Sequence, residues 1–178
     1  MFKIVNRIQA SPTIKQQSGF TLVELLVTMA VFGIALSIAV PNYKSMANSN
    51  RLVSQINTFS GAIAFARSEA IKQGVNIILT PLDATATPIN WAKGWNVELA
   101  SNNQILKRIE RFNAGTKLES ATNVANISLT GDGRINTVAN LVFNLCNEGT
   151  LVTAQDKKGR SLTISPTGTT YLDSNYTC

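Results

Sequence analysis

The chain has 178 residues, 44% of them hydrophobic, and a formal net charge of +6, a composition that suits one head domain with its own core. It contains no histidine and only two cysteines, which excludes Ser-His-Asp or Cys-His catalysis and leaves no donors for a four-ligand zinc site. Because the ten acidic residues are scattered singly, we predict a protein that is not an enzyme, with no catalytic residues, metal or cofactor.

Residues 1–19 form a basic leader, which contains three basic residues and no acid. Removing it would lower the formal charge from +6 to +3, because 13 basic and 10 acidic residues would remain. The apolar run from Phe20 to Val40 that follows is long enough, at ~1.5 Å per residue, to cross a ~30 Å hydrocarbon core. Gly19 precedes this run, whereas the cleavage site of a secretory signal peptide follows one. The positive-inside rule places the chain after Tyr43 outside the cytoplasm.

Glu24 is a carboxylate inside this apolar run. An acid at the centre of a membrane-spanning helix costs ~2.5 to 3.5 kcal/mol on insertion scales. One interpretation is that Glu24, near the start of the run, is solvated at the headgroup boundary. The other is that it pairs with a positive group, such as the new amino terminus created by cutting before Phe20. Its position alone does not choose between them.

The segment Gly19-Phe20-Thr21-Leu22-Val23-Glu24-Leu25-Leu26 resembles the prepilin processing motif of type IV pilins and type II secretion pseudopilins. The resemblance implies that an inner-membrane prepilin peptidase cuts between Gly19 and Phe20 and N-methylates Phe20. It also implies that Glu24 pairs with the amino terminus of a neighbouring subunit during assembly. Pro41 falls where pilins often carry a helix-bending proline, and its missing donor predicts a kink near Val40 on physical grounds as well.

Beyond Pro41 the sequence predicts an amphipathic helix over 44–74 that stops at Gly74. Its apolar residues recur at alternating steps of four and three. They are Leu52, Ile56, Phe59, Ile63, Ala66 and Ala70. We expect this stripe to face the core of the chain's own head; a seam with a partner helix is the alternative.

After Gly74, short β-branched runs alternate with turn signals, which predicts an antiparallel β-rich head over 75–178. We expect Trp95 to be a core aromatic residue. The predicted turns include Gly131-Asp132-Gly133 and Pro166-Thr167-Gly168. The predicted strands are 75–80, 95–99, 105–112, 124–130, 138–145, 151–153, 161–165 and 169–172.

Three head segments resemble the FimT/FimU and GspH-like minor pilins: 66–74, Gly94-Trp95, and Gly159-Arg160 with the hairpin that follows. The resemblance implies an α+β type IV pilin fold, with a long N-terminal helix packed on an antiparallel β-sheet or β-sandwich-like head. The expected organisation is a cleaved leader (1–19), a transmembrane or assembly half of the helix (20–43), an amphipathic half (44–74) and a periplasmic head (75–178).

Cys146 and Cys178 lie on the side of the membrane predicted to be periplasmic. Disulfides form in that compartment, so we expect the two cysteines to pair, with two free thiols as the alternative. Such a bridge would fix the carboxy-terminal tail. Paired cysteines near the carboxy terminus are also a point of resemblance to FimU-like minor pilins.

The resemblance implies a minor pilin that joins the priming complex of a type IV pilus and ends at or near its tip, serving adhesion, twitching motility or DNA uptake. The implied partners are other minor pilins, the major pilin and prepilin peptidase. The expected location is the inner membrane, with the head in the periplasm, and then the tip of the filament. A GspH-like pseudopilin of type II secretion is an alternative, since it shares these features.

FimT-like DNA capture, through non-specific contacts of lysine and arginine with phosphates, is a second alternative. An unrelated single-span receptor or enzyme is the remaining one. The lysines and arginines that would contact DNA could instead be solvated charges that discourage aggregation at strand edges. DNA-binding members also carry a Gly-Arg-x-Arg segment near the carboxy terminus, where this chain has Gly168-Thr169-Thr170-Tyr171. The candidate phosphate contacts are Lys107, Arg108, Arg111, Lys157, Lys158 and Arg160.

Overall fold

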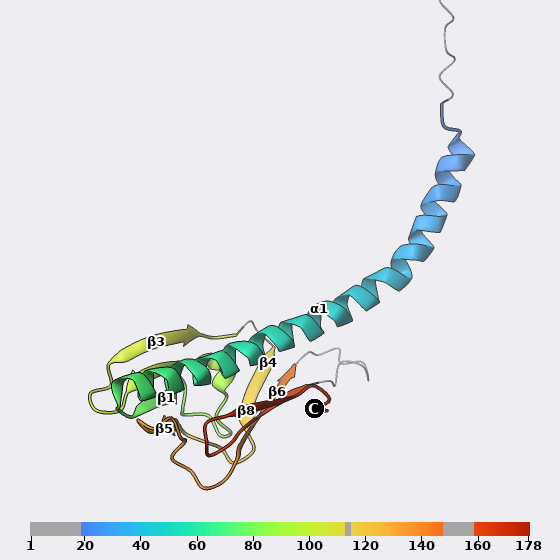
Figure 1. Cartoon of the computed structure of the whole chain (residues 1–178). Coiled ribbons are helices and arrows are strands. Elements are labelled where there is room, and N and C mark those ends of the chain that lie inside the picture. The colour runs from blue at the N-terminus through green and yellow to red at the C-terminus, as the bar shows by residue number, and fades with distance from the viewer. Residues whose placement is uncertain (1–18, 113–114, 148–158) are drawn as a thin grey trace, which may run out of the picture. The chain divides into compact units, whose positions relative to one another are not determined.

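The computed structural model describes residues 19–112, 115–147 and 159–178. These residues form a long helix α1 (Leu22–Gln73), a short 3₁₀ helix η1 (Trp91–Lys93) and eight strands. The chain divides into two compact units at the boundary between Pro41 and Asn42, which lies within α1 (Figure 1). We describe the two units separately.

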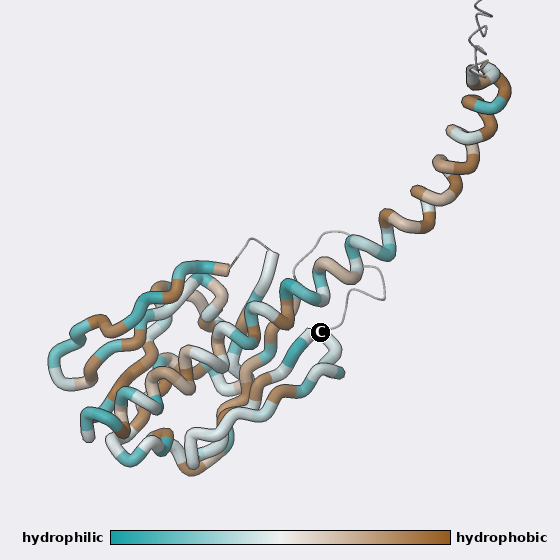
Figure 2. The backbone as a smooth tube through the Cα atoms, turned by 45° about the horizontal axis from the view of Figure 1, so that its top comes forward, coloured by the Kyte–Doolittle hydropathy of each residue, from teal (hydrophilic) through white to brown (hydrophobic). Residues whose placement is uncertain are grey.

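In the first unit, α1 is almost uniformly apolar (Figure 2). α1 has the length and composition needed to cross a membrane, and its apolar window is entirely unburied within the chain. Large side chains such as Phe32 and Ile34 are each 67% exposed. This part of the helix therefore has no apolar surroundings among residues 19–112, 115–147 and 159–178. Pro41 lies inside α1, and the kink expected there stays a prediction.

In the second unit, α1 buries one face against the head. All six residues of the predicted stripe are buried, so the stripe faces the core of its own domain, as expected. The helix ends at Gln73, and Gly74 follows with a φ of +66°. This left-handed conformation favours glycine and is common at a helix C-terminus, which confirms Gly74 as the predicted stop.

The head consists of two four-stranded antiparallel sheets with the orders β3-β2-β1-β5 and β4-β6-β7-β8 (Figure 1). Neighbouring strands in each sheet pair with continuous registers, apart from one irregularity between β2 and β3 at Val97 and Glu98. The strands are β1 (Ile77–Pro81), β2 (Gly94–Leu99), β3 (Ile105–Glu110), β4 (Thr116–Ser120), β5 (Ile127–Leu129), β6 (Leu141–Asn147), β7 (Arg160–Ile164) and β8 (Thr170–Asp173).

Strand β4 was not predicted, because its sequence Thr-Lys-Leu-Glu-Ser contains a single apolar residue. In the structure, Thr116, Leu118 and Ser120 alternate inward and are all buried. The strand expected at 138–145 begins only at Leu141, and Val138 is fully exposed. The strand expected at 151–153 lies outside the described residues.

Between the helix and the sheets lies a cluster of aromatic rings. The Phe59 ring centroid is 4.9 Å from that of Phe143, 5.1 Å from Trp95 and 5.8 Å from Trp91. All these pairs are edge-to-face, a geometry that adds ~0.5–1.5 kcal/mol per pair beyond the burial of area. Trp95 is a core residue, as predicted. Phe59 thus connects α1 to both sheets.

The polar loop between β1 and η1 contains an exposed ion pair. Lys93 Nζ donates to Asp83 Oδ2 at 2.5 Å, and Thr85 donates to the other carboxylate oxygen. These hydrogen bonds, that of Lys93 first, lower the pKa of Asp83 to about 2. A depressed pKa means that any stabilisation by this pair is complete above the ordinary pKa of an aspartate and is lost as the pH falls toward 2. The pair is solvent-exposed, so its contribution is small.

Candidate processing and assembly site

The predicted cleavage junction precedes α1. Gly19 and Phe20 are both exposed and non-helical, and Phe20 is 83% exposed. A Cβ atom added at Gly19 would have nothing within 4 Å. The peptide bond between Gly19 and Phe20 is therefore accessible, and the helix does not have to unwind to present it.

The helix begins directly after this junction with a side-chain cap. The hydroxyl of Thr21 accepts a hydrogen bond from the backbone N–H of Glu24 at 3.2 Å. Thr-x-x-Glu is the spacing of a capping box, in which the residue before the helix satisfies a free N–H of the first turn. Glu24 also places a negative charge near the positive end of the helix dipole. The capping role of Thr21 was not predicted from the sequence, although Thr21 and Glu24 have the spacing of a capping box.

Glu24 is exposed, and its carboxylate forms no ion pair with a lysine or arginine among residues 19–112, 115–147 and 159–178. Its charge is thus left available to a partner from outside this part of the chain. The pairing expected with a neighbouring amino terminus stays a prediction.

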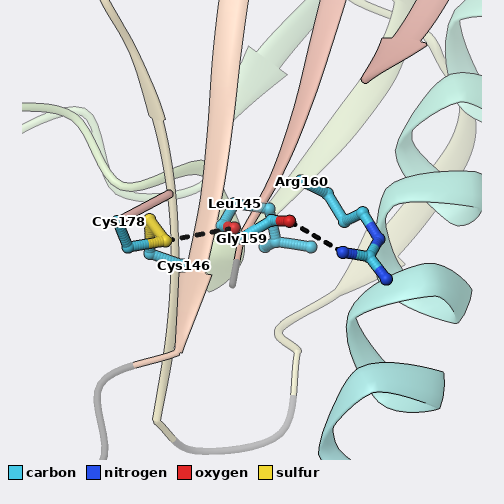
Figure 3. The surroundings of a disulfide bond; sticks show 5 residues. All are labelled: Leu145, Cys146, Gly159, Arg160 and Cys178. Atoms are coloured by element: carbon cyan, nitrogen blue, oxygen red, sulfur yellow. Dashed lines mark hydrogen bonds between the residues drawn. A yellow bond between two sulfur atoms is a disulfide. The ribbon is translucent and has the colours of Figure 1, made fainter. Parts of the chain in front are cut away.

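At the carboxy terminus, Cys146 and Cys178 form a disulfide with a Cα–Cα distance of 5.9 Å (Figure 3). Cys178 Sγ lies 3.9 Å from the carbonyl oxygen of Leu145. Gly159 sits beside the bridge, where an added Cβ would collide with Cys178 Sγ and lie 2.8 Å from the Leu145 carbonyl oxygen. The close approach of the tail to β6 therefore requires glycine at position 159.

Arg160 is not a surface cation, which corrects its prediction as a DNA contact. It is only 9% exposed, and Figure 3 shows its guanidinium turned toward α1. Nη1 donates to the carbonyl oxygens of Gly159 and Ser174 at 2.9 Å, and Nη2 donates to Ser49 Oγ at 3.1 Å. Arg160 therefore ties the tail and β7 to the helix, and its burial keeps it from serving as a surface contact for a phosphate.

A second arginine makes a parallel connection. Arg51 Nη2 donates to Asn147 Oδ1 at 2.7 Å, and Asn147 follows Cys146 at the end of β6. The disulfide and the two arginine contacts together fasten the ends of β6, β7 and the tail to one turn of α1. The sequence predicted the disulfide but not the arginine contacts, because buried and surface arginines look alike in a sequence.

Removing the disulfide is expected to lower the free energy of unfolding of the head by about 3–4 kcal/mol, since the bridge closes a loop with a sequence separation of 32. The measurement is denaturant unfolding of the detergent-solubilised full chain carrying both Cys146→Ser and Cys178→Ser. Reduction of the unmodified chain serves as the matched control and should give the same loss. Two thiols that react with an alkylating agent without reduction would contradict the bridge.

Among the described candidate DNA contacts, Lys107 and Arg108 are consecutive residues of β3 and so lie on opposite faces of it. Lys107 lies 5.2 Å from the centre of the Phe65 ring on α1. Arg108, its neighbour on β3, points to the opposite face of the strand and pairs with Glu110 at 3.0 Å. Arg111 is exposed beyond the end of β3. Lys157 and Lys158 lie outside the described residues.

An exposed Gly-Phe junction, a capped apolar helix and a two-sheet head packed on the second half of that helix define the type IV pilin class. Residues 14–40 match the motif described as the prokaryotic N-terminal methylation motif, and residues 55–168 match the family described as type II transport protein GspH. The chain belongs to this GspH family.

Solved structures and curated relatives agree with this class. Two crystal forms of the type IV minor pilin FimU from Pseudomonas aeruginosa superpose with TM-scores of 0.56 and 0.54 at 22% identity. They cover 78% and 75% of this chain and 95% and 96% of FimU, which confirms the pilin fold. Two P. aeruginosa proteins named "Fimbrial protein" are each 34% identical over 74 residues. That region spans 42% of this chain and 44% of each relative.

Members of this family and their structural neighbours are structural proteins, not enzymes. The class also implies that the chain is anchored in a membrane by its apolar helix and assembles with other pilins.

Proposed function

We propose that this protein is a minor pilin that joins the priming complex of a type IV pilus and remains at or near the filament tip. Prepilin peptidase cuts between Gly19 and Phe20 in the inner membrane and methylates Phe20. The head lies in the periplasm until other minor pilins and the major pilin join it. The protein supports adhesion, twitching motility or DNA uptake through the filament and performs no chemistry of its own.

The contrast between the two halves of α1 carries this proposal. The second half packs against its own head, because its apolar stripe is buried there. The first half is more apolar than the second, yet none of the apolar window of the helix is buried within the described chain. Only a bilayer or a bundle of similar helices offers such a surface an apolar environment along its whole length. A helix that is held first by the bilayer and then by a bundle needs an exposed apolar first half and a second half that packs on its own head.

Glu24 gives the bundle its register. A carboxylate moving from the headgroup region into a bundle must find a positive partner, and a processed neighbour presents one at its methylated amino terminus. The cap from Thr21 keeps the first turn of α1 formed up to the cut end, so Glu24 has a fixed place on the helix. Its pairing then aligns one subunit along its neighbour.

Replacing Glu24 with Ala or Gln is expected to lower incorporation into filaments by about 10- to 100-fold, the equivalent of one lost charge-assisted hydrogen bond. Glu24→Asp, which keeps the charge on a shorter side chain, should lose less. The measurement is the amount of this chain in sheared pili, detected by immunoblot. Leader removal, followed by mass, is the control and should be unchanged. Normal incorporation of Glu24→Ala would refute the role of Glu24.

A pseudopilin of type II secretion is a second candidate, favoured by the match of the head to the type II transport protein GspH family. Deleting the gene and restoring it separates the two functions. Loss and recovery of surface pili supports the first, whereas loss and recovery of protein secretion with intact pili supports the second.

The scattered cations of the head do not favour DNA capture. A gel-shift of the full chain in detergent with duplex DNA across a salt series tests this point. Binding that weakens steeply with salt would restore the DNA function.

A further inference from the structure

An open groove of about 830 Å³ lies beside the C-terminal part of α1. The helix lines one side and the turn between β7 and β8 lines the other. Its lining contains two cations, three hydroxyl side chains and exposed apolar atoms, but no acid. The lining residues are Ala64, Arg67, Ser68, Ile71, Lys72, Gly168, Thr169 and Thr170.

Arg67 is the unusual member of this lining. Its Nε atom is buried and has no hydrogen-bond partner. No ion pair or hydrogen bond joins its guanidinium to another of the described residues. Arg67 as a whole is half-buried, so its guanidinium is a partly desolvated cation whose charge no described acid balances through an ion pair.

The side chain of Arg67 is held in place without being paired. A Cβ atom added at Gly168 would lie 3.2 Å from Arg67 Cδ and Nε, and one added at Gly133 would lie 3.2 Å from Arg67 Nε, so the side chain packs close to both turns. Ile71 fills the space on the other side of Gly133. The base of the arginine side chain is thus packed between α1 and two turns, and such packing reduces the side-chain entropy lost on binding.

The acids near the groove are already engaged. Glu69 accepts hydrogen bonds from Gln73 and Lys72, and these lower its pKa. Asp132 accepts from Thr130 and from the backbone of Arg134, and the Thr130 bond chiefly lowers its pKa. Lys72 is paired with Glu69. Arg67 is therefore the cation of the lining that lacks a counter-charge within the described chain.

We propose that this groove receives an aspartate or glutamate side chain from the head of a neighbouring pilin, and that Arg67 binds that carboxylate. Guanidinium and carboxylate form strong, often bidentate hydrogen bonds. The hydroxyls of Ser68 and Thr169 lie within the same lining, and Ile71, 53% exposed, offers an apolar contact beside the charge. A nucleic-acid backbone fits less well, because a chain of phosphates needs several unpaired cations. The proposal rests on the proposed function, since it requires a neighbouring pilin.

The test is photo-crosslinking of the full chain in piliated cells. A benzophenone amino acid replaces Ala64, an exposed residue of the groove lining, and a second chain carries it at Phe32 in the apolar helix as a reference. We expect an adduct from position 64 to an acid-containing segment of another pilin, identified by mass spectrometry. Arg67→Gln and Ser68→Asp, which supplies an internal carboxylate, should each reduce this adduct about tenfold.

Arg108→Gln and Thr58→Ala are the matched controls, and neither should change the adduct, because neither residue lines the groove. Arg108 is an exposed arginine that is already paired on β3. A position-64 adduct that persists in Arg67→Gln, that maps to a segment without acids, or that contains nucleic acid would overturn the inference. Adducts from Phe32 to other pilins with none from position 64 would overturn it while leaving the proposed function intact. Absence of pilin adducts from both positions would overturn both.

Discussion

Replacing Gly19 with Val is expected to abolish leader removal, so that the chain accumulates at its full length of 178 residues in the membrane. The junction is exposed and non-helical, and an added Cβ at Gly19 meets nothing within 4 Å, so the substitution leaves the fold of the chain unchanged. A block would therefore arise from recognition by the peptidase. The measurement is the intact mass of the membrane-extracted protein with and without active prepilin peptidase.

Gly33→Ala is the matched control, since Gly33 lies in the same apolar segment and also has open space around it. It should be processed normally. If Gly19→Val lost its leader at the rate of the unmodified chain, the assignment of the processing site would be wrong. If the processed chain carried no methyl group on Phe20, the predicted methylation would be wrong, but the predicted cleavage site would stand.

Replacing Phe59 with Ala is expected to cost about 3–5 kcal/mol of unfolding free energy, which is a large part of the stability of a domain this size. Phe59 is fully buried and makes edge-to-face contacts with three other rings, so its loss leaves a cavity where the helix meets both sheets. The measurement is chemical unfolding of the full chain in detergent, followed by tryptophan fluorescence, because Trp91 and Trp95 border the cavity.

Thr58→Ala is the control, because Thr58 is the exposed neighbour of Phe59 on the same helix. It should change the free energy by less than about 0.5 kcal/mol. A loss at Phe59 no greater than at Thr58 would mean that the aromatic cluster does not hold the helix to the sheets.

The sequence predicted the parts of the fold that are marked by a local pattern of residue types. The helical stripe from Leu52 to Ala70 was identified from its spacing, and each of its members is buried. Gly74 and Trp95 were identified by similarly local signals. Strand β4 was not predicted, because two of its three buried positions are threonine and serine and the strands were identified from apolar residues.

The motif that residues 14–40 match could be found in the sequence, whereas the arginine contacts of the head could not. Gly19, Phe20 and Glu24 are close in sequence, so their relation is written in a short motif. Arg160, by contrast, depends on Ser49 and Ser174, which are far away in the sequence. From sequence alone, an arginine on a strand is expected to be a surface charge. Its burial becomes visible only when the fold shows which carbonyl groups surround it.

The apolar stripe of α1 also has a mechanical consequence. In the proposed filament, a subunit would be pulled along its helix, and the stripe runs along the helix axis for about 27 Å at ~1.5 Å per residue. Its contacts with the sheets are loaded together in shear, whereas contacts across a strand end would be peeled one after another. The Arg51 and Arg160 contacts stand at the end of the stripe where tension enters the head. The same burial that stabilises the domain at rest makes it resistant to force along its axis.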